Sequence, residues 1–360
     1  MKPFYIGSLQ IKLPIIQGGM GVGVSLSGLA SAVAHEGGIG VISCAGLGLL
    51  YRQKPADFMK DCIWGLKEEI RKAKEKSSGF IGINIMSALT NFSDMVRTSI
   101  QEKVDFLFVG AGLPLDLPSY LVPDSKTKLI PIVSSTRAAN IICDKWKRNY
   151  NYLPDAIVVE GPKAGGHLGF KKEQIEDESF SLENIVTEVV QVTKQYKEIK
   201  TIPVIAAGGI YTGEDIHRFI KLGAAAVQMG TIFVTSDECD AHYDFKRTYI
   251  DSKKDDLLII QSPVGMPGRA IHNEFINKVE SGTEVPAGCP WHCIKTCDYK
   301  KSPYCIMKAL HNSYKGKMTR GYAFAGSNAY LAKKISTVKE IIATLKSEYE
   351  AAELASSLNV

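Results

Sequence analysis

The chain has 360 residues, of which 45% are hydrophobic and 22% are charged. This composition is typical of a globular protein and excludes disordered, collagen-like and coiled-coil chains. The formal net charge of +5 is spread thinly, without a basic arm or an aromatic–basic repeat. It therefore excludes a nucleic-acid-binding protein and suits an anionic small molecule as the partner.

The N-terminal region and the cysteines predict a cytoplasmic protein that is not bound to a membrane. The N-terminus lacks the apolar core of a secretory signal. The charge-free stretch between Lys12 and Glu36 carries Gln17 and many glycines and serines, so we expect a buried strand and a turn there rather than a membrane span. Because eight cysteines occur without a secretory signal, we expect reduced thiols or metal ligands rather than disulfides.

Short apolar runs alternate with helical segments along the chain. The runs show little polar alternation, which is typical of parallel strands buried on both faces. The predicted strands cover residues 13–17, 40–43, 80–85, 106–110, 129–133, 156–160, 203–207 and 225–229. The predicted helices cover residues 28–35, 56–76, 91–102, 135–149, 181–196 and 212–222, the last opened by a capping box of Thr212 and Asp215.

This alternation predicts an α/β fold, a (β/α)8 TIM barrel with right-handed crossovers. A doubly wound open sheet is the alternative. Residues 237–320 depart from this alternation of strands and helices and contain a charged run, a Pro/Gly segment and a cysteine cluster. We therefore expect residues 1–236 and 321–360 to form the barrel, residues 237–320 to form an insertion or lid, and a final helix to cover residues 328–354. That long final helix suggests a homodimer.

Glycines follow the last two predicted strands, at the barrel end where active sites form. Gly208 and Gly209 follow one strand, and Gly230 and Thr231 follow the other. Without side chains, backbone N–H groups approach phosphate oxygens closely, so the two loops together predict a phosphate cradle. The alternative is that these glycines only make tight turns.

His167 lies in a glycine-rich loop, Gly165-Gly166-His167-Leu168-Gly169, at the same predicted rim. An imidazole there would donate a hydrogen bond to an anionic oxygen or move a proton. The alternative is a loop histidine satisfied by backbone groups. The sequence contains neither a Gly-x-Ser-x-Gly nor a His-Glu-x-x-His motif, so His167 is the candidate catalytic residue.

Several motifs together resemble the nitronate monooxygenase family and the related flavin-dependent enoyl-acyl-carrier-protein reductases. They are Pro-Ile-Ile-Gln-Gly-Gly-Met at 14–20, Gly-Ile-Asn-Ile-Met at 82–86, Glu160 with Ala-Gly-Gly-His-Leu-Gly at 164–169, Ala-Ala-Gly-Gly-Ile at 206–210, and Gln-Met-Gly-Thr at 228–231. The resemblance implies an FMN-binding barrel with His167 near the flavin and the substrate. It implies cofactor contacts from Gly19, Met20, Asn84, Gly165, Gly166, Gly208, Gly209, Gln228, Met229, Gly230 and Thr231.

Three possible functions follow from the barrel and this resemblance. The first is oxidation of nitronates or related small anions by an FMN-dependent enzyme. The second is reduction of an enoyl thioester, with electrons from NAD(P)H or from an electron carrier. The third is a flavin-free barrel that binds a phosphorylated ligand.

A cysteine cluster departs from the family pattern. Cys289, Cys293, Cys297 and Cys305 have the spacing C-x3-C-x3-C-x7-C. Thiolates suit iron–sulfur clusters and zinc, and we rank a [4Fe–4S] cluster first, structural zinc second and free buried thiols third. An iron–sulfur cluster would transfer single electrons beside the flavin. It would therefore favour a reductase that receives its electrons from an electron carrier.

Overall fold

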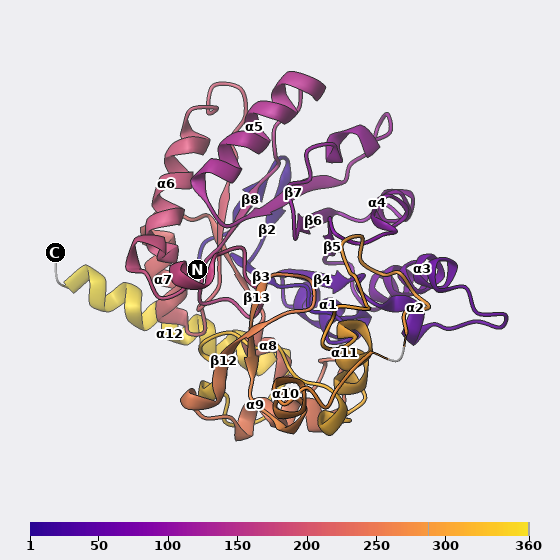
Figure 1. Cartoon of the computed structure of the whole chain (residues 1–360). Coiled ribbons are helices and arrows are strands. Elements are labelled where there is room, and N and C mark those ends of the chain that lie inside the picture. The colour runs from indigo at the N-terminus through magenta and orange to yellow at the C-terminus, as the bar shows by residue number, and fades with distance from the viewer. Residues whose placement is uncertain (287, 359–360) are drawn as a thin grey trace.

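The eight predicted strands form a closed parallel barrel, which confirms the TIM-barrel prediction over the open sheet (Figure 1). The computed structural model describes residues 1–286 and 288–358. The order around the barrel is β3-β4-β5-β6-β7-β8-β10-β11, and β11 closes the ring against β3. The strands are β3 (Ile15–Gln17), β4 (Ile39–Ser43), β5 (Phe80–Met86), β6 (Phe106–Gly110), β7 (Lys128–Val133), β8 (Ile157–Glu160), β10 (Val204–Ala207) and β11 (Ala226–Met229).

Apolar side chains cover both faces of the barrel strands. Ile16, Phe106, Phe108 and Ile205 belong to the cluster that fills the barrel interior, and alternate residues such as Ile83 pack outward against the helices. Burial on both faces explains why these strands appear in the sequence as continuous apolar runs.

The six predicted helices surround the barrel (Figure 1). They are α1 (Ser27–His35), α3 (Phe58–Lys76), α4 (Phe92–Gln101), α5 (Thr136–Tyr150), α6 (Leu182–Lys194) and α7 (Gly213–Lys221). The predicted capping box is confirmed: the Asp215 backbone N–H donates to Thr212 Oγ1 at 3.1 Å, and the Thr212 backbone N–H donates back to Asp215 Oδ2 at 3.1 Å. Two backbone N–H groups at the start of α7 therefore have partners.

Several short elements were not predicted. A hairpin of β1 (Phe4–Ile6) and β2 (Leu9–Ile11) inserts Phe4, Ile6 and Ile11 into the interior cluster. Two four-residue helices, α2 (Leu47–Leu50) and α8 (Thr231–Val234), follow β4 and β11. Single turns of 3-10 helix occur at Leu117–Tyr120, Lys172–Gln174, Glu178–Phe180, Lys254–Asp256, Met318–Arg320 and Ala329–Leu331. Elements this short have too few residues to show a period in the sequence.

Residues 237–320 add helices and a second sheet at the barrel rim. The helices are α9 (Tyr243–Asp251), α10 (Glu274–Glu280) and α11 (Ile306–Tyr314). Strands β12 (Leu257–Gln261) and β13 (Pro267–Ile271) join β9 (Gly166–His167), a strand of the loop after β8, in an antiparallel sheet. This segment is therefore bonded directly to the loop that carries His167, and its division from the barrel as a separate unit stays a prediction.

The final helix starts later than predicted. Helix α12 spans Val338–Leu358 and not residues 328–354. The reason is a second capping box: the Glu340 backbone N–H donates to Thr337 Oγ1 at 3.2 Å, and the Thr337 backbone N–H donates to Glu340 Oε2 at 2.9 Å. No helix within the described residues has the length and apolar character needed to cross a membrane. The homodimer stays a prediction.

Candidate active site at the mouth of the barrel

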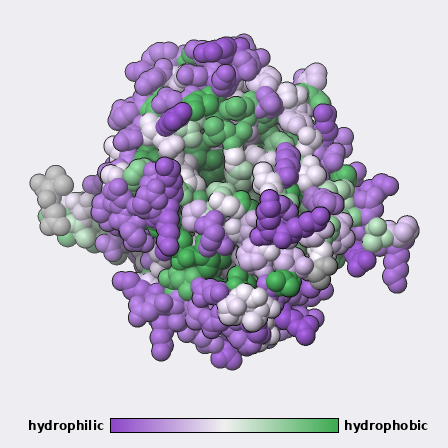
Figure 2. Space-filling view, in the orientation of Figure 1, coloured by the Kyte–Doolittle hydropathy of each residue, from purple (hydrophilic) through white to green (hydrophobic). Residues whose placement is uncertain are grey.

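One cavity of about 480 Å³ opens where the barrel strands end. Apolar side chains gather in a hollow on this face of the molecule (Figure 2). All the predicted catalytic and cofactor-binding residues line this cavity: Gly19, Met20, Asn84, Gly165, Gly166, His167, Gly208, Gly209, Gln228, Met229, Gly230 and Thr231. The structure thus brings together residues from five separate motifs, while their individual roles stay predictions.

The loop after β10 has a backbone that only glycine adopts readily. Gly208 and Gly209 have φ angles of +99° and +77°. A Cβ on Gly208 would lie 3.0 Å from the carbonyl oxygen of Gly161, and one on Gly209 would lie 2.8 Å from Cβ of Lys163. Because neither position has room for a side chain, the loop presents its backbone to the cavity.

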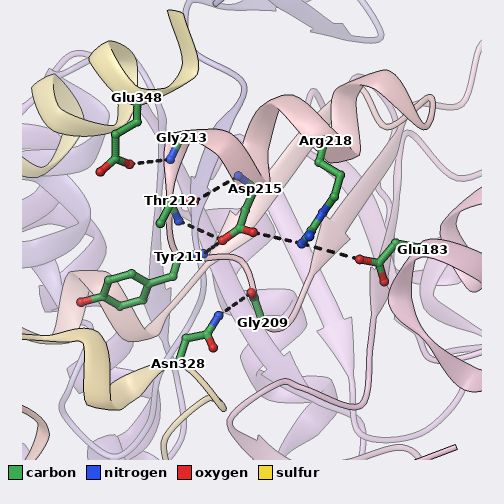
Figure 3. Close-up of polar contacts among 9 residues, drawn as sticks. All are labelled: Glu183, Gly209, Tyr211, Thr212, Gly213, Asp215, Arg218, Asn328 and Glu348. Atoms are coloured by element: carbon green, nitrogen blue, oxygen red, sulfur yellow. Dashed lines mark hydrogen bonds and ion pairs between the residues drawn. The ribbon is translucent and has the colours of Figure 1, made fainter. Parts of the chain in front are cut away.

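Side chains from distant segments hold this loop in place (Figure 3). Asn328 Nδ2 donates to the carbonyl oxygen of Gly209 at 2.8 Å. Asp215 accepts the backbone N–H of Tyr211 at 2.9 Å and forms an ion pair with Arg218 at 3.0 Å. On α12, Glu348 accepts the backbone N–H of Gly213 at 2.7 Å, so the C-terminal helix also anchors the loop.

The loop after β11 lies beside the first loop. Strands β10 and β11 are paired so that Ala207 faces Gln228, and the two following glycine loops therefore leave the barrel together. Thr231 Oγ1 accepts the backbone N–H of Gly326 at 3.1 Å. No lysine or arginine is among the described residues that line the cavity. An anion here would be held by backbone N–H groups rather than by cationic side chains.

The opposite part of the cavity floor is also tightly packed. A Cβ on Gly19 would lie 2.2 Å from Cβ of Asn84, and one on Gly230 would lie 3.3 Å from Sδ of Met20. The Asn84 amide donates only a long hydrogen bond of 3.4 Å, to the carbonyl oxygen of Phe108. Its polar atoms therefore remain available to a flat polar ligand in contact with Gly19.

His167 is held by residues of the second sheet. Its Cα pairs with Gly268 of β13, and its Nε2 lies 2.7 Å from Oγ of Ser262. The ring of Phe324 packs edge-on against the imidazole with the centroids 5.0 Å apart. Burial lowers the pKa of His167 to about 4. The imidazole is therefore neutral near pH 7, and a neutral imidazole can donate one hydrogen bond and accept another.

The family model described as nitronate monooxygenase matches residues 2–348 of the chain. The chain belongs to the nitronate monooxygenase family. Among curated relatives, a probable nitronate monooxygenase of Staphylococcus saprophyticus is 29% identical over 302 residues, covering 78% of this chain and 81% of the relative. One from Staphylococcus aureus strain Newman is 28% identical, covering 75% and 78%. These matches confirm the predicted family and make the chain an oxidoreductase.

Two solved structures superpose on almost the whole chain. FabK from Thermotoga maritima is 27% identical with a TM-score of 0.74, over 97% of this chain and 96% of that chain. A nitroalkane oxidase from Streptomyces ansochromogenes superposes with a TM-score of 0.72 over 96% and 98% of the two chains, at 20% identity. The second likeness shows the shared fold alone.

This nitronate monooxygenase family member has further site residues that the sequence did not reveal. Ser262 and Phe324, which contact His167, lie far from it along the chain, and only the sheet formed with β13 brings them together. Glu160, at the end of β8, was part of a motif but received no role. It is the one acidic side chain among the described cavity-lining residues, and burial raises its pKa to about 7.

The Ser262 hydroxyl is expected to position the His167 ring. Replacing Ser262 with alanine should lower kcat about fivefold, because a typical net hydrogen bond contributes about 1 kcal/mol. Ser262→Thr should restore most of the loss, since it keeps the hydroxyl. Steady-state kinetics of both variants, with Ser99→Ala on α4 as the control, would test this. A Ser262→Ala enzyme with unchanged kcat would show that the hydrogen bond between Ser262 and His167 does not position the imidazole ring.

The four clustered cysteines are free thiols in the structure. Within residues 1–286 and 288–358, no three His, Cys, Asp or Glu side chains are grouped so that they could hold a metal ion. The ranking of iron–sulfur, zinc and free thiols therefore stays a prediction.

Proposed function

We propose that the cavity binds FMN and that the chain oxidises nitronates with it. The observation that carries the proposal is the pair of glycine loops after β10 and β11, which expose backbone rather than side chains to one end of the cavity. The cavity volume of about 480 Å³ falls in the usual range for cofactor sites, about 300–1,000 Å³. FMN has a single phosphate that matches the glycine loops at one end of the cavity, and a flat ring that matches the closely packed floor at the other end.

The residues present fit each part of this cofactor. The phosphate would be held by backbone N–H groups of Gly208, Gly209, Gly230 and Thr231. At the three glycines, a Cβ would press on neighbouring atoms. The ring would lie against the floor formed by Gly19, Met20 and Asn84. When bound, FMN accepts two electrons from the substrate, and the protein orients both.

Neutral His167 would hold the substrate. A nitronate carries its negative charge on oxygen atoms, and a neutral imidazole donates one N–H to such an atom. If Nε2 accepts the Ser262 hydroxyl, then Nδ1 carries the proton and is the donor; the opposite tautomer reverses these roles. Apolar groups such as Phe324, Met266 and Ile294 line the same cavity and limit access of water to the reacting atoms.

Anaerobic mixing with a nitronate tests the assignment. The protein is purified, loaded with FMN and mixed with the anion of nitroethane or 2-nitropropane in the absence of oxygen. Bleaching of the flavin absorption at a rate that saturates with nitronate concentration would support the proposal. A flavin that stays oxidised with both nitronates would contradict nitronate oxidation while leaving FMN binding intact.

Enoyl-thioester reduction is the second candidate, and one observation favours it. No cationic side chain is found among the described residues lining the cavity, and His167 is neutral, so nothing there attracts an anionic substrate by charge. A neutral imidazole would instead donate to the thioester carbonyl oxygen while charge develops on it. Reduction of the bound FMN by NAD(P)H or a one-electron carrier, followed by reoxidation by crotonyl thioester, would establish this activity.

Glu160 is expected to give nitronate oxidation a characteristic pH dependence. Its pKa is raised to about 7 by burial, so the carboxyl is neutral below pH 7 and ionised above it. The ionised form repels an anionic substrate by about 1 kcal/mol, which is about fivefold between the fully neutral and fully ionised forms, so kcat/KM should fall about threefold between pH 6 and pH 8. In Glu160→Gln the fall should disappear, whereas exposed Glu173→Gln should keep it. The same fall in Glu160→Gln would assign the titration to another group.

A further inference from the structure

A second cavity of about 580 Å³ lies between the second sheet, helix α10 and the segment before α11. Its volume falls in the usual range for small-molecule sites, about 300–1,000 Å³. No described residue lines both this cavity and the active-site cavity. The second cavity is therefore a separate site, and the proposed function leaves it unexplained.

The walls of the second cavity are mostly apolar, with one free hydroxyl hydrogen among them. Tyr304 and Tyr322 both line the cavity, are buried, and share one hydrogen bond of 3.1 Å between their hydroxyl groups. Two hydroxyl groups carry two hydrogens, and within the described residues only one of these hydrogens has an acceptor. A buried donor without an acceptor costs free energy, which a ligand oxygen would recover. The aliphatic and phenyl side chains that line the same cavity are Ile259, Ile260, Val264, Phe275, Ile276 and Val279.

The charged side chains of the second cavity disfavour an anion. Among the described lining residues they are Glu280, Asp298 and Lys301. Lys301 pairs with Asp298 at 3.4 Å, so Glu280 leaves the lining with a net charge of −1. A carboxylate or phosphate ligand would be repelled by this charge. An uncharged carbonyl oxygen would accept the free hydroxyl hydrogen without such repulsion.

We propose that the second cavity binds an uncharged aliphatic carbonyl compound and that its occupation slows catalysis at His167. The alkyl chain lies against the isoleucine and valine side chains, and the carbonyl oxygen accepts a hydrogen bond from the tyrosine pair. The proposal goes beyond the proposed function, because it concerns a ligand that is neither the substrate nor the cofactor.

One turn of the chain separates the two cavities. Ser262 and Val264 line the second cavity, whereas Met266 lines the active-site cavity. The Ser262 backbone N–H donates to the carbonyl oxygen of Met266 at 3.0 Å, and the Ser262 Oγ lies 2.7 Å from Nε2 of His167. A Cβ on Gly265 would meet no atom within 4 Å, so the turn has room to shift. A ligand that presses on Val264 therefore moves the Ser262 hydroxyl relative to the imidazole.

A row of aromatic rings makes a second connection between the cavities. Tyr322 packs edge-on against Phe324, with the ring centroids 5.0 Å apart. Phe324 in turn packs edge-on against His167, also with the centroids 5.0 Å apart. Because closely packed side chains transmit small displacements, a ligand in contact with Tyr322 reaches the imidazole by this path as well.

Calorimetric titration of the full, FMN-loaded chain tests the site. Decan-2-one is the probe, and decanoate is its charged counterpart of the same chain length. We expect decan-2-one to bind with a Kd of about 0.1 mM, and decanoate to bind about fivefold more weakly. Val279→Trp, which fills the second cavity from α10, should abolish ketone binding, whereas Val122→Trp at an exposed loop position should keep it. Glu280→Gln should narrow the difference between the two ligands to about twofold.

Steady-state kinetics tests the connection to His167. Saturating decan-2-one should lower kcat for nitronate oxidation about threefold, because the hydrogen bond from Ser262 is weakened. KM should change little. Ser262→Ala should show no such fall because it lacks the hydrogen bond, and Val279→Trp should show none because it lacks the site. A rise in KM alone would place the ketone in the active-site cavity and overturn the proposal.

The other results that would overturn the proposal are equally specific. They are failure of decan-2-one to bind, equal affinity for the ketone and decanoate, ketone binding that persists in Val279→Trp, and an unchanged kcat with the ketone bound. Thermal melting shows whether Val279→Trp is folded; if it is not, Glu280→Gln decides, because Glu280 is exposed. A chain that does not oxidise nitronates contradicts the proposed function alone. Calorimetry does not depend on turnover, and the effect on kcat is then measured with crotonyl thioester.

Discussion

Replacing Gly208 with alanine is expected to lower FMN affinity at least tenfold. Gly208 has a φ of +99°, and its new Cβ would lie 3.0 Å from the Gly161 carbonyl oxygen and 3.1 Å from both N and Cβ of Ala164. Backbone strain of this kind costs about 1–3 kcal/mol, and a loss of about 1.4 kcal/mol in binding is tenfold in affinity. Because the loop must move away from the segment that leads to His167, the phosphate cradle and the catalytic loop change together.

A matched control separates this effect from general strain. Gly223, which follows α7, has a nearly identical φ of +102°, and a Cβ there would meet only Val190 at 3.4 Å. Gly223→Ala should lower the melting temperature as Gly208→Ala does but bind FMN as the unchanged protein does. Flavin titration followed by fluorescence quenching measures the FMN affinity of both variants, and thermal melting measures their stability. Equal FMN affinity in the two variants would show that the loop after β10 does not hold the phosphate.

Removing the imidazole of His167 should have the largest effect on catalysis. In His167→Ala we expect kcat to fall about 10²–10⁴-fold, the usual contribution of a group that donates or moves a proton. FMN binding should change little, because the phosphate loops lie on other strands. The pKa of His167 is lowered to about 4 by burial, so the activity of the unchanged enzyme should show no inflection from this group between pH 5 and pH 8.

Two further variants define what the histidine contributes. His167→Gln keeps a donor and should retain more activity than His167→Ala, whereas a proton-transfer role would leave both equally low. His35→Ala, at the exposed end of α1, is the control and should keep full activity. Full activity in His167→Ala would remove this residue from the mechanism.

The barrel was predictable because each of its strands can be recognised from its own short stretch of sequence. Strands buried on both faces appear as uninterrupted apolar runs, and β5 and β6 occur within a residue of where the pattern predicts them. The start of α12 was missed although its signal is also local: Thr337 and Glu340 form a capping box that the continuous helical composition around them obscured.

The site was predictable only in part. The glycine loops and His167 follow predicted strands directly, so the geometry of a parallel barrel brings them to one end. Ser262 and Phe324 reach His167 through β13, a strand of the second sheet whose pairing with β9 spans about a hundred residues of sequence. No local pattern reports such a pairing. The neutrality of His167 and the raised pKa of Glu160 arise from burial, which also requires the folded structure.

Comparing FMN with riboflavin in one titration tests the central claim, that backbone amides of two strand-end loops hold a flavin phosphate. The two ligands share the ring and the ribityl chain and differ in the phosphate alone. We predict that FMN binds at least about a hundredfold more tightly than riboflavin to the unchanged protein, a difference of ~2.7 kcal/mol, which is within reach of two charge-assisted hydrogen bonds. Equal affinity for the two ligands, or no binding of either, would contradict the account.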